Sequence, residues 1–383
     1  MTAVAAAACA VERLRLYQFR NYAEAVVEFA PGVNVISGSN AQGKTNLLEA
    51  VATLSLTRSP RAAATADLLQ WGADQCAVEA TITRPGAPAT LAVHFVRDLA
   101  SGRIGRSAMV DGKPRPASAL PGICPVVLFW PEDLLIVKAG PEARRRLLDT
   151  MLAQLDRVAA DAMARYRRVL VQRNALLKQL RAGGSGRDML PGFTREIAAL
   201  GARIQTARTR LVGALGPHAE RALAQLSAGR ERLELRYTPA HAPATTDEQI
   251  AEEALRMAFA ARSGEELARA MTLVGPHRDD LAFDVDGRPA RTAASQGQQR
   301  SIVLAVKMAE VNVVCDRSGL TPVMILDDVL SELDSSRRTD LLTMLAARAP
   351  QQVLLTTAEP LYDLGALHVA RRLTVQAGVV SLA

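Results

Sequence analysis

Residues 38–45 of this chain read Gly-Ser-Asn-Ala-Gln-Gly-Lys-Thr and match every fixed position of the phosphate-binding loop pattern. In such a loop, successive backbone N–H groups surround a phosphate at the N-terminus of a helix. Lys44 would reach the β- and γ-phosphates, and the Thr45 hydroxyl would ligate Mg²⁺. A strand pattern precedes the loop and a helical pattern follows it, which is the setting that this chemistry requires. The residues predicted to bind ATP here are Gly38, Ser39, Asn40, Ala41, Gln42, Gly43, Lys44, Thr45 and Asn46.

A pair of acids near the other end of the chain has the form of the missing half of this site. The aliphatic run 323–326 is closed by Asp327 and Asp328. At the end of a buried strand, Asp327 would hold Mg²⁺ and Asp328 would orient or deprotonate the attacking water, so we assign the catalytic roles to Lys44 and Asp328. Two adjacent acids also commonly open a loop, but the aliphatic residues before them favour the strand end. Thr45 and Asp327 are 282 residues apart, which implies that the segment between them is an insertion projecting from the nucleotide site.

A third segment, formed by Ser295, Gln296, Gly297 and Gln298, opens a predicted helix. A serine at the N-cap with exposed backbone amides is a second potential anion site. One phosphate loop is already placed, so this segment suggests a site that is completed across a dimer, with each partner contributing one half. Plain helix capping is the alternative, and the segment taken alone favours it slightly.

The remaining patterns predict an α/β fold in which both chain ends form one domain. Strand patterns occupy the first ~130 residues. A helical pattern then runs from Pro141 to about Arg181, a glycine-rich turn follows at 183–186, and a second helical run covers 191–226, which predicts an antiparallel helical hairpin. Strand patterns return at 281–285, 323–326 and 353–356. We therefore predict a head formed by residues 1–135 and 272–383, with residues 136–271 as an inserted helical arm.

The predicted helical hairpin is rich in basic residues. Residues 141–212 contain fifteen Lys and Arg against six Asp and Glu, a balance of +9 that exceeds the +7 of the whole chain. Such a surface favours the phosphate backbone of DNA, and a solvated helical face is an equally good explanation. The residues that we predict to contact DNA are Arg165, Arg168, Arg173 and Lys178.

The composition limits the cellular setting. Four cysteines, Cys9, Cys76, Cys124 and Cys315, lie far apart without a CxxC pair, which favours reduced thiols in the cytoplasm and argues against zinc. No apolar stretch reaches the ~20 residues of a membrane span, so we expect no membrane contact. The alanine-rich start lacks a basic leader before an apolar core and does not resemble a signal peptide.

Together these segments resemble the RecF family of bacterial recombination and gap-repair ATPases, which belongs to the ABC-type ATPases related to SMC proteins. The similar segments follow the family order along nearly the whole chain. They are residues 19–22, 38–49, 131–134, 144–149, 272–281, 295–300 and 325–334. The resemblance implies an ABC/SMC-like ATPase head formed from both chain ends, with an inserted α-helical arm.

The resemblance also assigns roles. Lys44 and Thr45 would belong to Walker A, Asp327 would be the Walker B Mg²⁺ ligand, and Ser295 to Gln298 would be a signature motif that caps ATP on the opposite protomer. Asp328 stands where ABC ATPases usually carry a catalytic glutamate, and Thr356 or Thr357 stands near the position of the switch histidine of ABC transporters. The shorter acid at position 328 is consistent with slow hydrolysis.

The function implied by the resemblance is an ATP-controlled DNA clamp. ATP and Mg²⁺ would drive homodimerisation, and the dimer would bind double-stranded DNA and junctions between single- and double-stranded DNA. RecR and RecO would be partners in loading RecA, in the cytoplasm at the nucleoid. The alternatives are an ABC transporter ATPase subunit, which the basic insertion and the absence of a recognisable Q-loop disfavour, and an SMC-like structural protein, for which the arm is too short.

Overall fold

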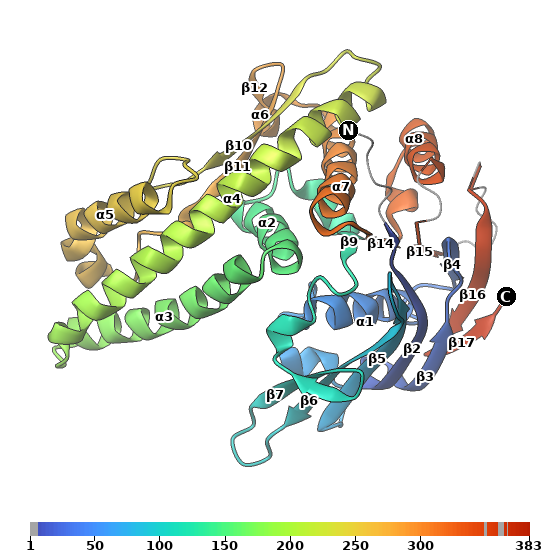
Figure 1. The fold of residues 1–383 in the computed structure, drawn as a ribbon, viewed down its shortest axis with the longest axis horizontal. Helices are drawn as coiled ribbons and strands as arrows, with labels where there is room; N and C mark the ends of the chain where they lie inside the picture. The colour runs from blue at the N-terminus through green and yellow to red at the C-terminus, as the bar shows by residue number, and fades with distance from the viewer. Residues whose placement is uncertain (1–6, 348–350, 359–363, 366) are drawn as a thin grey trace. The chain divides into compact units, whose positions relative to one another are not determined.

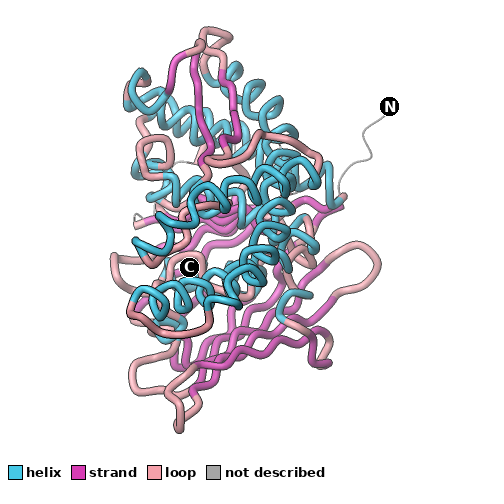
Figure 2. The backbone as a smooth tube through the Cα atoms, turned by 90° about the vertical axis from the view of Figure 1, so that its left-hand side faces the viewer, coloured by secondary structure: helices cyan, strands magenta, loops and turns pink. Residues whose placement is uncertain are grey.

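The computed structural model describes residues 7–347, 351–358, 364–365 and 367–383. The chain forms two units (Figures 1 and 2). Unit 1 comprises Met1–Leu134 and Lys307–Ala383, and unit 2 comprises Leu135–Val306. None of the helices in the described part of the chain has an apolar stretch sufficient to cross a membrane.

The first sheet of unit 1 joins strands from both chain ends. Its order is β17-β16-β4-β15-β14-β9, and every neighbouring pair is parallel except β16 with β17. Every residue of the parallel strands β4, β15, β14 and β9 is buried, as expected for a parallel sheet that is covered on both faces. The strands are β4 (Val33–Ser37), β9 (Val126–Phe129), β14 (Val323–Asp327), β15 (Val353–Thr357), β16 (Val369–Gln376) and β17 (Val379–Leu382).

The second sheet of unit 1 is antiparallel, with the order β3-β2-β5-β6-β7-β8. Helix α1 (Lys44–Leu56) contacts strands of both sheets, and it is buried on nearly every side, as a helix between two sheets must be. The dipeptide Asp111-Gly112 predicts a hairpin turn, and the structure confirms it, with positive φ at both residues. The strands are β2 (Ala10–Phe19), β3 (Tyr22–Glu28), β5 (Gln75–Thr83), β6 (Ala89–Arg97), β7 (Ile104–Val110) and β8 (Lys113–Arg115).

Unit 1 also contains smaller elements. Strand β1 (Ala7–Ala8) pairs with β13 (Leu320–Thr321), and helix α8 (Ser335–Ala346) follows the strand β14. The sequence pattern predicts that this last helix extends to Arg348, which lies outside the described residues. It also predicts a hairpin around Ala377 and Gly378, which the structure confirms as the turn between β16 and β17.

Unit 2 contains the helical hairpin, formed by α3 (Arg157–Arg181) and α4 (Leu190–Leu226). The prediction of one continuous helix from Pro141 to Arg181 was wrong. The chain is extended at Asp156, whose side chain accepts a hydrogen bond from the Ala159 N–H and caps α3, so that α2 (Pro141–Leu155) is a separate helix. At about 1.5 Å per residue, the 25 residues of α3 reach ~37 Å, which is shorter than the continuous helix would be.

The predicted boundary of the arm at residue 271 also needs correction, because unit 2 continues to Val306. Strand β11 (Asp280–Val285) pairs along its length with β10 (Leu233–Thr238), which ties it to the arm. Unit 2 also contains α5 (Glu248–Arg269), β12 (Arg288–Pro289), α6 (Ala290–Ala293) and the first half of α7 (Gln296–Ser318).

Candidate nucleotide site

The phosphate-binding loop connects β4 to α1, as the sequence predicted. Gly43 has a φ of 116°, and a Cβ there would lie 2.6 Å from Asn21 Nδ2. Gly38 has a φ of 150°, and a Cβ there would collide with the Val375 carbonyl oxygen. Both glycines are therefore required by space as well as by backbone conformation. The loop therefore packs against the Val375 backbone at Gly38 and against the Asn21 side chain at Gly43.

Lys44 is buried at the start of α1, with 7% of its surface exposed. Its Nζ donates hydrogen bonds to the carbonyl oxygens of Gly38, at 2.7 Å, and Ser39, at 2.9 Å. Burial lowers the pKa of Lys44, while the charges of Asp328 and Asp327 oppose that shift. Among the residues that the structure describes, the partners of the ammonium are carbonyls of its own loop and no carboxylate forms an ion pair with it, so phosphate oxygens would replace those carbonyls.

The two chain ends meet at Thr45 and Asp327. The Thr45 hydroxyl lies 2.9 Å from both carboxylate oxygens of Asp327, the last residue of β14. The Thr356 hydroxyl donates to Asp327 Oδ1 at 2.7 Å from the neighbouring strand β15. Burial raises the pKa of Asp327, and the hydrogen bonds from Thr356 and Thr45 oppose the rise. The structure thus brings together a hydroxyl and a carboxylate that are 282 residues apart.

Asp328 turns the chain away from the sheet. It has a φ of 50°, in the left-handed region, and its backbone N–H donates to the Thr356 hydroxyl at 2.9 Å. Thr356 therefore links the two adjacent acids, donating to one and accepting from the other. The side chain of Asp328 is half-buried. It therefore retains access to solvent, which a residue that positions a water molecule requires.

Sequence reasoning missed the residues that brace the loop from outside. Asn21 Nδ2 donates to the Gln42 carbonyl at 3.1 Å, and the Tyr22 hydroxyl donates to the Gly43 carbonyl at 2.9 Å. The N–H of Ala377, in the β16–β17 turn, donates to Gln42 Oε1 at 2.7 Å. Residues 19–22 were recognised as part of the family resemblance without a role. Nothing in the sequence pattern marks a C-terminal turn as a support for an N-terminal loop.

The arrangement fits a bound nucleotide triphosphate with Mg²⁺. The Lys44 ammonium has exchangeable carbonyl partners, and the Thr45 hydroxyl and the Asp327 carboxylate form the oxygen pair that Mg²⁺ prefers. The N-terminus of α1, with no side-chain cap, leaves its N–H groups for phosphate oxygens. The donor set therefore matches the chemistry predicted from the sequence.

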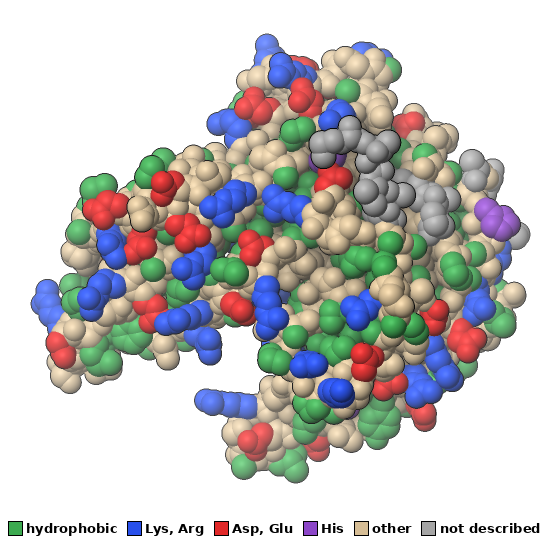
Figure 3. Space-filling view, viewed as in Figure 1, with side chains coloured by type: hydrophobic (Ala, Val, Ile, Leu, Met, Phe, Trp, Pro, Cys, Tyr) green, Lys and Arg blue, Asp and Glu red, His purple; other side chains and the backbone are tan. Residues whose placement is uncertain are grey.

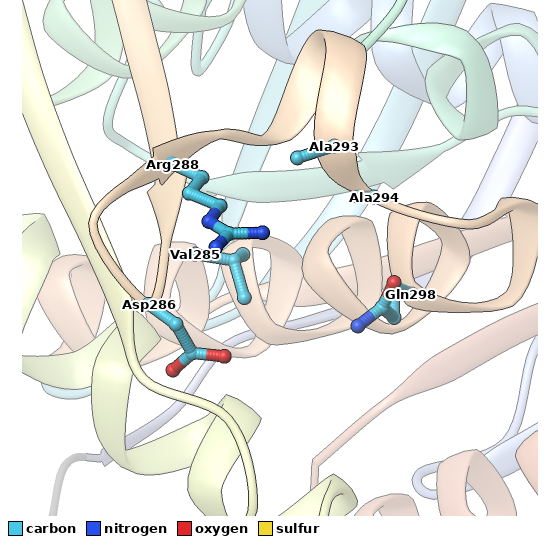
Figure 4. A pocket seen from close by; sticks show the side chains of 6 residues that line it. All are labelled: Val285, Asp286, Arg288, Ala293, Ala294 and Gln298. Atoms are coloured by element: carbon cyan, nitrogen blue, oxygen red, sulfur yellow. The ribbon is translucent and has the colours of Figure 1, made fainter.

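The predicted signature segment lies in unit 2 at the start of α7. The Ser295 N–H donates to Gln298 Oε1 at 2.8 Å, and the Gln298 N–H donates to the Ser295 hydroxyl at 3.2 Å, which is a reciprocal capping arrangement. Ser295 and Gln296 remain exposed. A pocket of about 330 Å³ lies beside Gln298, with Arg288 on its other side (Figure 4). Capping and an accessible anion site are therefore compatible in this segment.

The arm corrects one of the predicted DNA contacts. The Arg173 side chain is 2% exposed and forms an ion pair with Glu266 at 2.6 Å, so it is not available to DNA. Arg165 is exposed but pairs with Glu196 at 2.6 Å. Arg168 and Lys178 are exposed on α3.

Charge counting in the sequence overestimated how basic the arm surface is. Arg144 pairs with Asp280, Arg173 with Glu266 and Arg203 with Glu248, and all three acids lie outside residues 141–212. On the face shown in Figure 3, Lys and Arg side chains are interspersed with Asp and Glu rather than gathered in one patch.

Comparison with known proteins agrees with this geometry. The family model for the RecF/RecN/SMC N terminal domain matches residues 10–363. A DNA replication and repair protein RecF from Acidothermus cellulolyticus is 40% identical over 378 residues, covering 97% of this chain and 99% of the relative. One from Halalkalibacterium halodurans is 38% identical, covering 91% of this chain and 93% of the relative.

Solved structures show the same fold. The recombination mediator protein RecF with ATP, in the RecFOR pathway, has a TM-score of 0.88 at 28% identity and covers 100% of both chains. The Smc head domain from Pyrococcus furiosus has a TM-score of 0.53 at 15% identity, covering 98% of this chain and 96% of that chain, and shares the fold alone.

The fold and the site define an ATP-binding head of the kind that ABC-type ATPases and SMC proteins share, with an inserted helical arm. Within that class the relatives are specific. The chain belongs to the RecF family of DNA replication and repair proteins.

Proposed function

We propose that this protein is an ATP-dependent DNA-binding protein of recombinational gap repair and replication restart, which acts as a clamp closed by ATP. The observation that carries the proposal is the contact between Thr45 and Asp327, because it assembles a nucleotide site from both ends of a repair-family chain. An ABC transporter ATPase subunit is not favoured, since the relatives are DNA replication and repair proteins.

Each residue of the site has a distinct task in this proposal. The loop N–H groups and Lys44 bind the β- and γ-phosphates, and Asp328 positions the water that attacks the γ-phosphate. Bound Mg²⁺, held by Thr45 and Asp327, would neutralise charge that develops on the phosphate oxygens. The carboxylate of Asp328 reaches less far than that of a glutamate, so we expect slow hydrolysis that DNA stimulates. Turnover of tens per second in the presence of DNA would contradict this assignment.

The second half of the site comes from a partner copy. Ser295 immediately precedes the 23-residue helix α7, which begins at Gln296, and both Ser295 and Gln296 are exposed. In the ATP-bound homodimer this segment contacts the γ-phosphate held by the partner copy, so that ATP joins the protomers and hydrolysis releases them. Support comes from the accessibility of the segment and from the family to which the chain belongs.

Double-stranded DNA and junctions with single-stranded DNA are the proposed ligands of the closed dimer. Arg168 and Lys178 are the exposed candidates on α3 for phosphate contacts, and Arg165 would have to exchange Glu196 for a phosphate. A solved RecF relative is described as a recombination mediator in the RecFOR pathway. By that likeness we propose RecO and RecR as partners in loading RecA, at the nucleoid in the cytoplasm.

Sedimentation with and without ATP tests the proposal. We expect the wild type to be monomeric without nucleotide, to dimerise with ATP and Mg²⁺, and to bind duplex DNA more tightly as the dimer. Lys44→Arg should remain monomeric with ATP, because the longer planar group does not fit the closed loop. Arg168→Ala should lower the salt dependence of DNA binding by about one phosphate contact without affecting dimerisation. ATP-independent dimers without DNA affinity would contradict the proposal.

A further inference from the structure

The chain crosses between unit 1 and unit 2 at two points. Within unit 1, a buried ion pair connects residues that lie next to these two points. Unit 1 ends at Leu134 and resumes at Lys307. Lys307 Nζ lies 3.2 Å from Asp133 Oδ2 and 3.4 Å from Glu310 Oε2. The side chains of Lys307 and Glu310 are 5% and 3% exposed, and that of Asp133 is 24% exposed. Asp133, one residue before the first part of unit 1 ends, and Lys307, where its second part begins, are therefore held together within unit 1.

The electrostatics of this cluster keep its charges balanced. Burial disfavours the ammonium, but Asp133 and Glu310 outweigh burial and raise the pKa of Lys307. Burial also raises the pKa of Glu310 to about 7, against the opposing charge of Lys307. The cluster holds one cation and two acids, so retention of the Glu310 proton brings its net charge closest to neutral. The ion pair between Lys307 and Asp133 is then the main electrostatic tie.

Asp133 is positioned by the strand next to the Walker B strand. Strands β9 and β14 are parallel, and Phe129 lies opposite Leu326, so the turn after β9 begins beside Asp327. The oxygen of Asp133 that faces Lys307 also accepts a hydrogen bond from the Trp130 N–H at 3.0 Å. A shift of the strand end at Asp327 would therefore move the carboxylate that holds Lys307.

Arg61 packs against the turn that carries Asp133. Its guanidinium carbon lies 5.6 Å from the centroid of the Trp130 ring. Arg61 belongs to the segment that follows α1, the helix at the phosphate-binding loop. The turn therefore has a side-chain contact with a segment that continues from that helix.

Lys307 lies on the same continuous helix as the proposed signature motif. Helix α7 runs without interruption from Gln296 to Ser318. At about 1.5 Å per residue, the twelve residues from Ser295 to Lys307 correspond to ~18 Å of helix. A rigid helix is an efficient way to transmit a displacement between two sites.

We propose that Lys307 is a positioning residue that couples nucleotide binding at Asp327 to the placement of Ser295, through its ion pair with Asp133. The inference deepens the proposed function and rests on it, because Ser295 acts only in an ATP-dependent dimer. The proposal predicts that ATP binding to the monomer does not depend on Lys307, whereas ATP-dependent dimerisation does.

A charge-free variant separates coupling from stability. Replacing one member of a buried ion pair leaves the other unpaired, whereas replacing both with apolar residues of similar size is often tolerated. We therefore choose the double variant Lys307→Met with Glu310→Met, and Asp133→Asn as a second variant in which Lys307 and α7 are unchanged. The matched control is Arg173→Met with Glu266→Met, which removes a buried ion pair from the arm.

The experiment measures ATP binding to dilute monomer by equilibrium dialysis and ATP-dependent dimerisation by sedimentation. For both unit 1 variants we expect monomer affinity for ATP within about twofold of the wild type and a dimer dissociation constant raised by about tenfold or more. Hydrolysis should show a lower kcat with little change in KM. Lys307→Arg, which preserves the charge, should recover most of the dimerisation. The arm control should dimerise like the wild type.

The outcomes distinguish the two proposals. A wild type that stays monomeric with ATP would overturn the proposed function and the coupling with it. If the wild type dimerises and the unit 1 variants dimerise equally well, the coupling is wrong and the proposed function stands. Should the double variant fail to fold, Asp133→Asn decides the question by the same criterion.

Discussion

The candidate nucleotide site of the head and the helical arm each bury a cluster of charged side chains, but the two clusters are satisfied in different ways. In the head, the Lys44 ammonium donates to carbonyls of its own loop, and Asp327 accepts from hydroxyls alone. In the arm, Arg173 faces the carboxylate of Glu266 and also donates to the Thr272 hydroxyl at 2.9 Å. In the nucleotide site the buried charges have neutral hydrogen-bond partners, whereas in the arm a buried cation pairs with a buried carboxylate.

The difference separates a binding site from a structural one. Neutral partners are exchanged for phosphate or Mg²⁺ at modest cost, because a ligand of opposite charge forms stronger hydrogen bonds than they do. A buried arginine that is already paired with a carboxylate would have to break that pair before it could bind DNA, leaving a buried charge unpaired. A buried basic residue therefore has a different role according to its partner.

Breaking the arm pair should produce the largest effect on stability. Arg173→Met leaves the carboxylate of Glu266 buried without a cation, and we expect the arm to lose about 3–5 kcal/mol. Hydrogen exchange in α3 and α4 should report the loss, while the exchange of α1 and ATP binding remain close to wild type. The matched double variant with Glu266→Met should recover most of the stability. Loss of DNA binding with unchanged arm stability would instead restore Arg173 as a DNA contact.

In the head, replacing a glycine of the phosphate-binding loop should lower ATP affinity far more than replacing a glycine elsewhere. Gly43→Ala places a Cβ against Asn21 Nδ2 and pushes the N–H groups of the loop out of position, so we expect ATP affinity to fall by about 100-fold. Gly72→Ala is the matched control, since Gly72 has a φ of 82° with nothing within 4 Å of the added Cβ. It should cost ~1–2 kcal/mol of stability from backbone strain and leave ATP binding unchanged. Isothermal titration of both variants with ATP makes the comparison.

The pH dependence of stability should have opposite signs in the two units. Burial lowers the pKa of His277, in the arm, to about 4, and burial raises the pKa of Glu310, in the head, to about 7. Neutral His277 therefore stabilises the arm above its unfolded pKa of about 6.5, and this contribution is lost as the pH falls towards 4. Protonated Glu310 stabilises the head below its unfolded pKa, and this contribution is lost as the pH rises through 7.

Urea unfolding of His277→Gln and Glu310→Gln at pH 5 and pH 7.5 tests these signs. Relative to its own variant, the wild type should gain ~1–3 kcal/mol from His277 on going to pH 7.5 and lose a similar amount from Glu310. Hydrogen exchange in each unit assigns the change to the arm or the head. If the two contributions to the free energy of unfolding change in the same direction with pH, burial does not determine the pKa shift of one of the two residues.

The sequence could predict the head better than the arm, for a physical reason. A phosphate loop is specified locally, because Gly38, Gly43 and Lys44 must occupy fixed positions between a strand and a helix. Asp327 follows a strand of aliphatic residues, and parallel strands bring their carboxyl ends to one edge of the sheet, so its meeting with Thr45 could also be inferred.

The partner of a buried charge is a tertiary property that residue spacing does not contain. Arg173 and Arg168 are both basic residues on α3, yet one is buried against Glu266 and the other is exposed. In the sequence, Arg173 interrupts an otherwise apolar stripe of the predicted helix. This position was a sign of its burial, and we interpreted the residue as surface charge. The bracing of the loop by Ala377 likewise depends on a turn 335 residues away from Gln42.

The smallest expected effect concerns the hydroxyl that links the two head acids. Thr356→Val removes the donor to Asp327 Oδ1 and leaves the Asp328 N–H without its acceptor, which should cost ~1–3 kcal/mol. Because the Thr356 hydrogen bond opposes the effect of burial on Asp327, its loss should raise the pKa of that acid further and increase the Mg²⁺ concentration needed for ATP-dependent dimerisation.

Thr53→Val is the matched control, since the Thr53 hydroxyl is buried on α1 without a hydrogen-bond partner among the described residues. Its removal should be neutral or stabilising, because a valine in that place buries no unsatisfied polar group. Equal effects of the two substitutions on the Mg²⁺ requirement would mean that Thr356 contributes packing alone. The contrast between neutral partners in the nucleotide site and an ion pair in the arm would then depend on Lys44 and Thr45.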